Sequence, residues 1–171
     1  MVSCLLIGIN VAAVGIVLPL VLSLHFVYYK AMIIAIDFGD VNIGVAVTDE
    51  ENRFVFPKCV IKTTLFMKHP DILITQIPRF SEVTEIVIGL PMNLKGEHTP
   101  QTDKAIAFAD FVTQTFPGIP VVLFDERFSS TIVLRRHQAL GGHQKDLKSS
   151  KDMLEAAQIL EDYLRRKSNE N

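Results

Sequence analysis

Four acidic residues stand where elements of the predicted fold begin or end, and their types and positions indicate a site for hard divalent cations. Asp37 follows the apolar run 33–36. Asp125 and Glu126 end a later apolar run, and Asp152 begins the last predicted helix. Carboxylates without accompanying His or Cys are the ligands that magnesium prefers. Two such ions can activate a water molecule and stabilise the leaving oxygen of a phosphodiester.

Each acidic residue also has an ordinary structural interpretation. Asp37 can form a turn at the end of its strand, and the adjacent acids after the later run can be a solvated strand end. Asp152 can cap its helix with Glu155 as partner, or can itself be the partner of a capping Ser149. Taken singly, each ordinary interpretation is favoured. Taken together, the acids lie at the ends of strands and a helix that meet at one edge of the sheet. This arrangement favours a functional site.

The apolar patterning predicts one α/β layer fold after residue 31. Two runs joined by a short Gly-containing turn predict antiparallel strands. Two later apolar runs separated by an amphipathic segment predict a parallel, right-handed crossover. The predicted strands are 32–37, 42–48, 54–61, 85–91 and 119–127. The predicted helices are 68–80, 99–116, 129–140 and 150–166.

The composition excludes several classes of protein. With 171 residues, of which 49% are hydrophobic, the chain has enough apolar material for a core. A formal net charge of -2 and a pI of about 6.2 exclude a globally basic surface for nucleic acid, so any such surface is local. Cys4 and Cys59 are too few for a disulfide framework or a zinc site, which indicates a reducing compartment.

Residues 1–29 contain no Asp, Glu, Lys or Arg and differ in composition from the rest of the chain. The segment is long and apolar enough for a membrane anchor. A signal peptide is disfavoured because the segment has no basic start. We favour a third interpretation, in which it is an upstream translation of a gene whose start codon encodes Met32. We therefore expect an N-terminal extension, 1–31, and a self-sufficient domain, 32–171.

Other residue types give no rival site of equal strength. No Gly-x-Ser-x-Gly sequence surrounds Ser129, no pair of His has metal-ligand spacing, and no glycine-rich phosphate loop is present. Basic residues lie near the acids in sequence, where they can hold phosphates or remain ordinary surface charges. We predict nucleic-acid contacts for Arg127, Lys145, Lys148 and Lys151.

The segment 141–150 is a predicted polar loop between the last two helices, longer than most helix connections. It contains two glycines together with Lys145 and Lys148. Beside an acidic site such a loop can close over a phosphate backbone, and an ordinary surface loop is an equally good interpretation.

Four segments in a fixed order carry the most specific signal. They read AIDFGDVNIGVAVTD, EIVIGLPMNLKGEHTPQT, VVLFDERFSST and DMLEAAQILEDYL. Together they resemble the RNase H-like family of Holliday junction resolvases, also described as pre-16S rRNA nucleases of the YqgF type. The resemblance extends from Met32 to about Leu164.

The resemblance implies an RNase H-like α/β fold, with a mixed five-stranded sheet, an antiparallel second strand and helices on both faces. It also implies a nuclease centre that uses Mg²⁺ or Mn²⁺, in which Asp37, Glu126 and Asp152 match the catalytic acids. Asp125 belongs to the same motif as Glu126. Neighbours on a strand face opposite ways, so one of this pair is expected to bind metal directly, and the sequence does not decide which.

From this resemblance we expect a cytoplasmic, metal-dependent endonuclease that acts on structured nucleic acid, as a monomer or homodimer. Its expected role is 5′-end processing of pre-16S rRNA, with the ribosome as a partner. Cleavage of a Holliday junction is an alternative for the same site. A further alternative is a non-catalytic nucleic-acid-binding factor in ribosome assembly. Asp40, Val41 and Asn42 favour it slightly, because family members commonly carry basic residues there.

Overall fold

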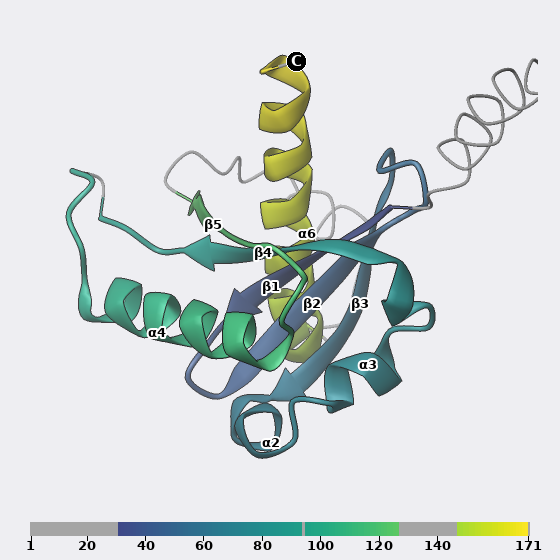
Figure 1. Cartoon of the computed structure of the whole chain (residues 1–171). Coiled ribbons are helices and arrows are strands. Elements are labelled where there is room, and N and C mark those ends of the chain that lie inside the picture. The colour runs from purple at the N-terminus through teal and green to yellow at the C-terminus, as the bar shows by residue number, and fades with distance from the viewer. Residues whose placement is uncertain (1–30, 94, 127–146, 171) are drawn as a thin grey trace, which may run out of the picture. The chain divides into compact units, whose positions relative to one another are not determined.

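A five-stranded mixed sheet with the strand order β3-β2-β1-β4-β5 forms the centre of the structure (Figure 1). Strand β2 runs antiparallel to both β1 and β3, whereas β4 and β5 run parallel to β1. The strands span Met32–Phe38 (β1), Asn42–Thr48 (β2), Val55–Lys62 (β3), Val83–Leu90 (β4) and Val121–Asp125 (β5).

The computed structural model describes residues 31–93, 95–126 and 147–170, without the side chains of 147–150. These residues belong to one compact unit, Ala31–Asn171. Residues 1–30 of the N-terminal extension and the predicted helix 129–140 lie outside the described residues. Within the described ranges, no helix has both the length and the apolar character needed to cross a membrane.

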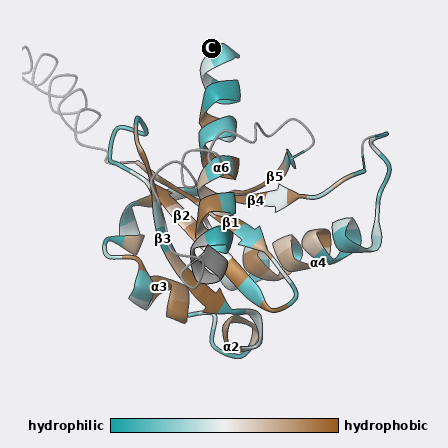
Figure 2. Ribbon diagram, turned by 180° about the vertical axis from the view of Figure 1, so that it is seen from behind, coloured by the Kyte–Doolittle hydropathy of each residue, from teal (hydrophilic) through white to brown (hydrophobic). Residues whose placement is uncertain are grey.

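Helices cover both faces of the sheet, as the family resemblance implies. Helices α2, α3 and α4 pack on one face, and the long α6 packs on the other (Figure 1). The helices span Thr63–Lys68 (α2), Ile72–Gln76 (α3), Pro100–Thr115 (α4) and Leu147–Asn169 (α6), and a 3₁₀ turn, η1, spans Phe80–Glu82. Figure 2 shows that hydrophobic residues gather in the strands, whereas the C-terminal end of α6 is hydrophilic.

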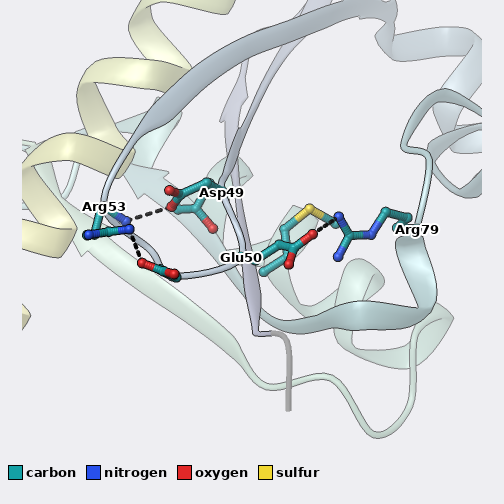
Figure 3. Close-up of a pocket in the computed structure, with 7 residues that line it drawn as sticks. Asp49, Glu50, Arg53 and Arg79 are labelled. Carbon is teal, nitrogen blue, oxygen red and sulfur yellow. Dashed lines mark hydrogen bonds and ion pairs between the residues drawn. The ribbon is translucent and has the colours of Figure 1, made fainter. Parts of the chain in front are cut away.

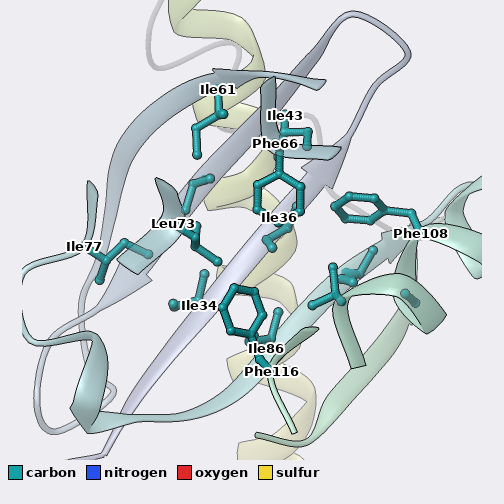
Figure 4. Packing of buried hydrophobic residues seen from close by; sticks show 14 of the residues in the cluster. Ile34, Ile36, Ile43, Ile61, Phe66, Leu73, Ile77, Ile86, Phe108 and Phe116 are labelled. Carbon is teal, nitrogen blue, oxygen red and sulfur yellow. The ribbon is translucent and has the colours of Figure 1, made fainter. Parts of the chain in front are cut away.

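Strand β1 is buried on both faces because its side chains alternate between two hydrophobic clusters. Ile34 and Ile36 join the cluster beneath α2, α3 and α4 (Figure 4). Ile33 and Ala35 pack in the cluster beneath α6. The same alternation directs Asp37 to the face that α6 covers, near the carboxyl end of the strand.

The single helix predicted over 68–80 is wrong. Over that range the structure has the last residue of α2, the short helix α3 and the start of the turn η1. Helix α2 ends at Lys68, shortly before Pro70, and α3 ends at Gln76, shortly before Pro78. Proline has no backbone N–H to donate and disfavours helical backbone in the residue before it. The two prolines therefore divide the segment.

Helix α6 begins earlier than predicted, at Leu147. Asp152 consequently lies inside the helix, in its second turn, and does not cap it. The capping interpretations of Asp152 are therefore wrong. Residues 147–150, the end of the predicted loop 141–150, are helical, and the rest of that predicted loop lies outside the described residues.

The remaining predicted elements within the described ranges agree with the structure to within a few residues. Helix α4, for example, begins directly after Thr99, whose side-chain oxygen accepts a hydrogen bond from the backbone N–H of Thr102. Pro100 occupies the first helical position, where its missing N–H costs nothing. The mixed sheet, the antiparallel β2 and the two helical layers confirm the predicted RNase H-like α/β fold.

We expect residues 32–171 to fold without the N-terminal extension. Residues Ala31–Asn171 form a compact unit that contains two hydrophobic clusters of its own. Expressing the chain from Met32 should therefore yield a folded protein whose melting temperature matches that of the full chain. Thermal unfolding followed by circular dichroism checks this, and failure of the shorter chain to fold would show that residues 1–31 are structural.

Candidate functional site

Asp37 lies between two glycines on the neighbouring strands. On one side it pairs with Gly44 of β2. On the other side, continuing the register one residue beyond Ile36 and Ile88 brings it beside Gly89 of β4. Neither glycine has a side chain to cover the sheet, so the α6 face is open on both sides of the Asp37 carboxylate. Each opening receives another acidic residue.

The opening at Gly44 is filled by the backbone of α6. A Cβ atom at Gly44 would overlap the carbonyl group of Asp152, so the helix can lie this close to β2 only because residue 44 is glycine. Asp37 and Gly44 are paired across the ladder. The contact therefore brings Asp152 next to Asp37, on the same face of the sheet.

The opening at Gly89 is filled by the side chain of Glu126. A Cβ atom at Gly89 would overlap the carboxylate of Glu126, which therefore lies directly over β4. Glu126 thus reaches the α6 face immediately after the end of β5. The buried Phe124, two residues earlier, packs on that same face.

Asp125 is separated from this arrangement by strand alternation. It ends β5, opposite Leu90 of β4, and lies between two residues that face α6. After burial, the charges that raise the pKa of Asp37 are those of Glu126, Glu155 and Asp152. The charge of Asp125 acts on Glu126. Of the two adjacent acids, Glu126 is therefore the one that shares a face with Asp37.

Burial and the charges of neighbouring acids raise the pKa of both central carboxylates. Burial, followed by the charges of Glu126, Glu155 and Asp152, raises the pKa of Asp37 to about 7, although the ammonium of Lys151 lowers it. Burial, followed by the charges of Glu155 and Asp125, raises the pKa of Glu126 to about 7. Perturbed carboxylates that face each other are typical of functional sites.

Glu155 is part of the acidic face, and sequence reasoning missed this role. We considered it only as a capping partner of Asp152. In α6 the two residues are three positions apart, so they lie on the same side of the helix. The charge of Glu155 raises the pKa of both Asp37 and Glu126. The spacing of three positions between Asp152 and Glu155 in a predicted helix was the signal in the sequence that could have indicated this role.

The raised pKa values predict an unusual dependence of stability on pH. Asp37 and Glu126 bind protons more tightly in the folded chain, with a pKa of about 7, than at their ordinary values of 3.8 and 4.5. Their stabilising protonation is complete below about pH 4 and is lost as the pH rises through about 7. Without divalent cations, Asp37→Asn should thus increase the free energy of unfolding at pH 8 by about 2 kcal/mol.

Denaturant unfolding at pH 8 and pH 4.5, in the presence of EDTA, measures this difference. The gain from Asp37→Asn should shrink at pH 4.5, because the wild-type carboxyl is then protonated. Asp110→Asn, on the exposed face of α4, is the matched control and should change stability little at either pH. A variant that is less stable than wild type at pH 8 would contradict the prediction.

The acidic face has the donor chemistry of a site for a hard cation. Its four carboxylates, Asp37, Glu126, Asp152 and Glu155, supply oxygen atoms only, which suits Mg²⁺ or Mn²⁺. Among the described residues, no three or more His, Cys, Asp or Glu side chains are already gathered into a set of metal ligands. A cation would therefore have to draw these carboxylates inward, and it would relieve the repulsion among them.

The predicted nucleic-acid-binding residues lie mostly outside the described part of the chain. Arg127, Lys145 and the side chain of Lys148 are not described. Lys151 is described: its ammonium lies 3.3 Å from Glu155, and its side chain is 57% exposed. The ammonium group of Lys151 can contact a phosphate that approaches the edge of the acidic face.

A separate pocket lies at the opposite end of the sheet (Figure 3). Its arginines are engaged in ion pairs: Arg79 contacts Glu50 and Glu82, and Arg53 contacts Glu51. It reaches the sheet at the beginning of β1 and the end of β2, away from the acidic face. This pocket is therefore not part of the candidate site.

Comparison with known proteins gives consistent results. Residues 31–166 match the sequence profile of the RuvX family, whose description is Holliday junction resolvase. A relative from Chloroflexus aurantiacus (strain J-10-fl), named for pre-16S rRNA nuclease activity, is 35% identical over 144 residues, covering 82% of this chain and 91% of its own. A relative with the same name from Corynebacterium jeikeium is 35% identical, covering 77% of this chain and 84% of its own. Another, from Rickettsia felis, is 30% identical, covering 79% of this chain and 86% of its own.

Proposed function

Because the chain belongs to the RuvX family of Holliday junction resolvases, we propose that its acidic face is the centre of a divalent-cation-dependent endonuclease. The observation that carries this proposal is the placement of Glu126 and Asp152 over the two glycines that flank Asp37. Structural carboxylates seldom gather on a partly buried face where their charges oppose one another. A phosphodiesterase needs such carboxylates to hold its cation, which explains why the unfavourable repulsion among them is retained.

The four acidic residues have two kinds of role in the proposed mechanism. Asp37 and Glu126 would hold the cation, with Asp152 and Glu155 completing its surroundings. When bound, the cation supplies activation of water and stabilisation of the leaving oxygen. Without it, Asp37 and Glu126 are partly protonated near neutral pH, since their pKa is about 7. Asp37 and Glu126 would release those protons in order to hold the cation. Lys151 would contact the substrate phosphate.

We propose the 5′-extended precursor of 16S rRNA as the substrate, and the cytoplasm as the place of action. This choice is supported by the names of relatives that are 30–35% identical over most of the chain. A four-way DNA junction is the second candidate, supported by the description of the matching family. Both present bent, phosphate-rich backbones, which a site built from carboxylates and Lys151 can engage without reading bases.

A side-by-side cleavage assay tests the proposal. Precursor rRNA and a four-way DNA junction are each incubated with the purified protein in Mg²⁺, in Mn²⁺ and in EDTA. We expect cleavage of the RNA with either cation and none in EDTA, and Asp110→Asn should cleave like wild type. Cleavage of the junction alone would assign the DNA substrate. Tight binding of the RNA without cleavage in any cation would instead indicate the non-catalytic assembly factor.

A further inference from the structure

Asn42 connects the acidic face to a lysine on the edge strand β3. The side-chain Nδ2 of Asn42 donates a hydrogen bond to Oδ2 of Asp152, at 2.8 Å. The side-chain Oδ1 of Asn42 accepts one from Nζ of Lys62, at 2.9 Å. A single amide thus joins three elements, the start of β2, the end of β3 and the second turn of α6.

The two partners of Asn42 fix the orientation of its amide. A lysine ammonium has only donors, and an ionised carboxylate has only acceptors. The oxygen of the amide must therefore face Lys62, and the NH₂ group must face Asp152. Without the lysine, the amide could turn over and present its oxygen to the carboxylate, which would repel it. Lys62 thus selects the amide orientation that holds Asp152.

The backbone and the side chain of Asp152 are positioned by two different residues of β2. Gly44 lets the α6 backbone at Asp152 lie against the sheet. Asn42 lies two residues earlier, on the same face of the strand, and its hydrogen bond engages one of the two carboxylate oxygens. The glycine sets how far Asp152 is from Asp37, and the asparagine sets how its carboxylate is turned.

We propose that Asn42 and Lys62 are positioning residues that orient the Asp152 carboxylate toward the divalent cation. This inference rests on the proposed function, because it assigns a role within the same site. Ligands held by outer hydrogen bonds bind metal more tightly, since less freedom is lost on binding. Neither residue needs to touch the cation or the substrate for this effect.

The test measures Mn²⁺ affinity by isothermal titration in four proteins: wild type, Asn42→Ala, Lys62→Met and Lys104→Met. Lys104 forms an ion pair with Asp40 at 2.8 Å and has no link to Asp152. Lys104→Met is therefore the matched control, because it also removes one lysine from a polar contact. We expect Asn42→Ala to weaken Mn²⁺ binding by about 10-fold. Lys62→Met should weaken it by about 2- to 3-fold, because the amide can still donate in one orientation. Lys104→Met should bind like wild type.

Kinetics separate positioning from a role in substrate binding. In Asn42→Ala, kcat at limiting Mg²⁺ should fall with the weakened metal affinity and recover at saturating Mg²⁺, while KM for the nucleic acid stays unchanged. Melting temperatures in EDTA monitor folding in every variant. A lower melting temperature with unchanged Mn²⁺ affinity would mean that Asn42 is only structural, which overturns the inference.

Failure of the inference is distinguishable from failure of the proposed function. If Asp37→Asn abolishes Mn²⁺ binding but Asn42→Ala does not weaken it, the positioning role is wrong and the site stands. If wild type binds no Mn²⁺ and cleaves nothing, the proposed function fails and the positioning role falls with it.

Discussion

Replacing Asp37 with Asn is expected to lower the rate of cleavage by more than about 100-fold, while the metal-free protein becomes more stable at pH 8. Loss of an outer hydrogen bond around a metal costs about 10- to 100-fold in activity or affinity, and loss of a direct ligand should exceed that. Stability should rise because burial and three neighbouring acids oppose the ionised form of Asp37. Opposite changes in stability and activity are characteristic of a functional site.

Single-turnover cleavage of the precursor rRNA at saturating Mg²⁺, together with denaturant unfolding in EDTA, measures both changes. Glu126→Gln should behave in the same way, since its pKa is raised to about 7 by burial, Glu155 and Asp125. Asp110→Asn should alter neither quantity. Retention of more than about a tenth of wild-type activity by both site variants would show that these carboxylates do not hold the cation.

The two glycines that flank Asp37 should respond differently to substitution by Ala. At Gly44 the new Cβ would overlap the helix backbone at Asp152, which can move only by shifting α6. Gly44→Ala should therefore cost about 2–4 kcal/mol of stability as well as activity. At Gly89 the overlap is with the carboxylate of Glu126 and the end of the Ile159 side chain, which can both turn aside. Gly89→Ala should cost less than about 1 kcal/mol and still reduce cleavage at least about 10-fold, since Glu126 is displaced.

Gly118→Ala is the matched control for this pair. Gly118 has φ +99° and no atom within 4 Å of an added Cβ, so its substitution strains the backbone without reaching the acidic face. Gly118→Ala should lower the free energy of unfolding by about 1 kcal/mol and leave the cleavage rate per folded molecule unchanged. Denaturant unfolding and initial cleavage rates report both quantities. Wild-type activity in a folded Gly89→Ala protein would contradict the placement of Glu126 in the site.

The sequence predicts most of the fold because the elements that carry it have simple local patterns. The runs 33–36 and 85–91 are apolar on both faces, as buried strands are. The Gly-containing turn before β2 predicts its antiparallel direction, which the structure confirms. The helix predicted over 68–80 fails because its two prolines are stronger signals than its apolar spacing.

The site is less predictable because it depends on close approaches between elements that are distant in sequence. Asp37 and Glu126 can be singled out by their places at strand ends. Asp152 is predicted at the start of the last helix but lies in its second turn. The roles of Gly44 and Gly89 cannot be, because a glycine in a strand does not reveal what lies above it. The partners of Asn42 are likewise set by packing, since Asp152 is 110 positions away in the chain.

Anomalous diffraction from crystals of the protein grown with Mn²⁺ tests the central claim most directly. The predicted result is an anomalous peak on the α6 face of the sheet, with carboxylate oxygens of Asp37 and Glu126 about 2.2 Å away and Asp152 beside it. The peak should be absent from crystals of Asp37→Asn grown in the same way. A wild-type crystal with no peak at this face, or with its only peak elsewhere, would contradict the assignment of these carboxylates as the cation site.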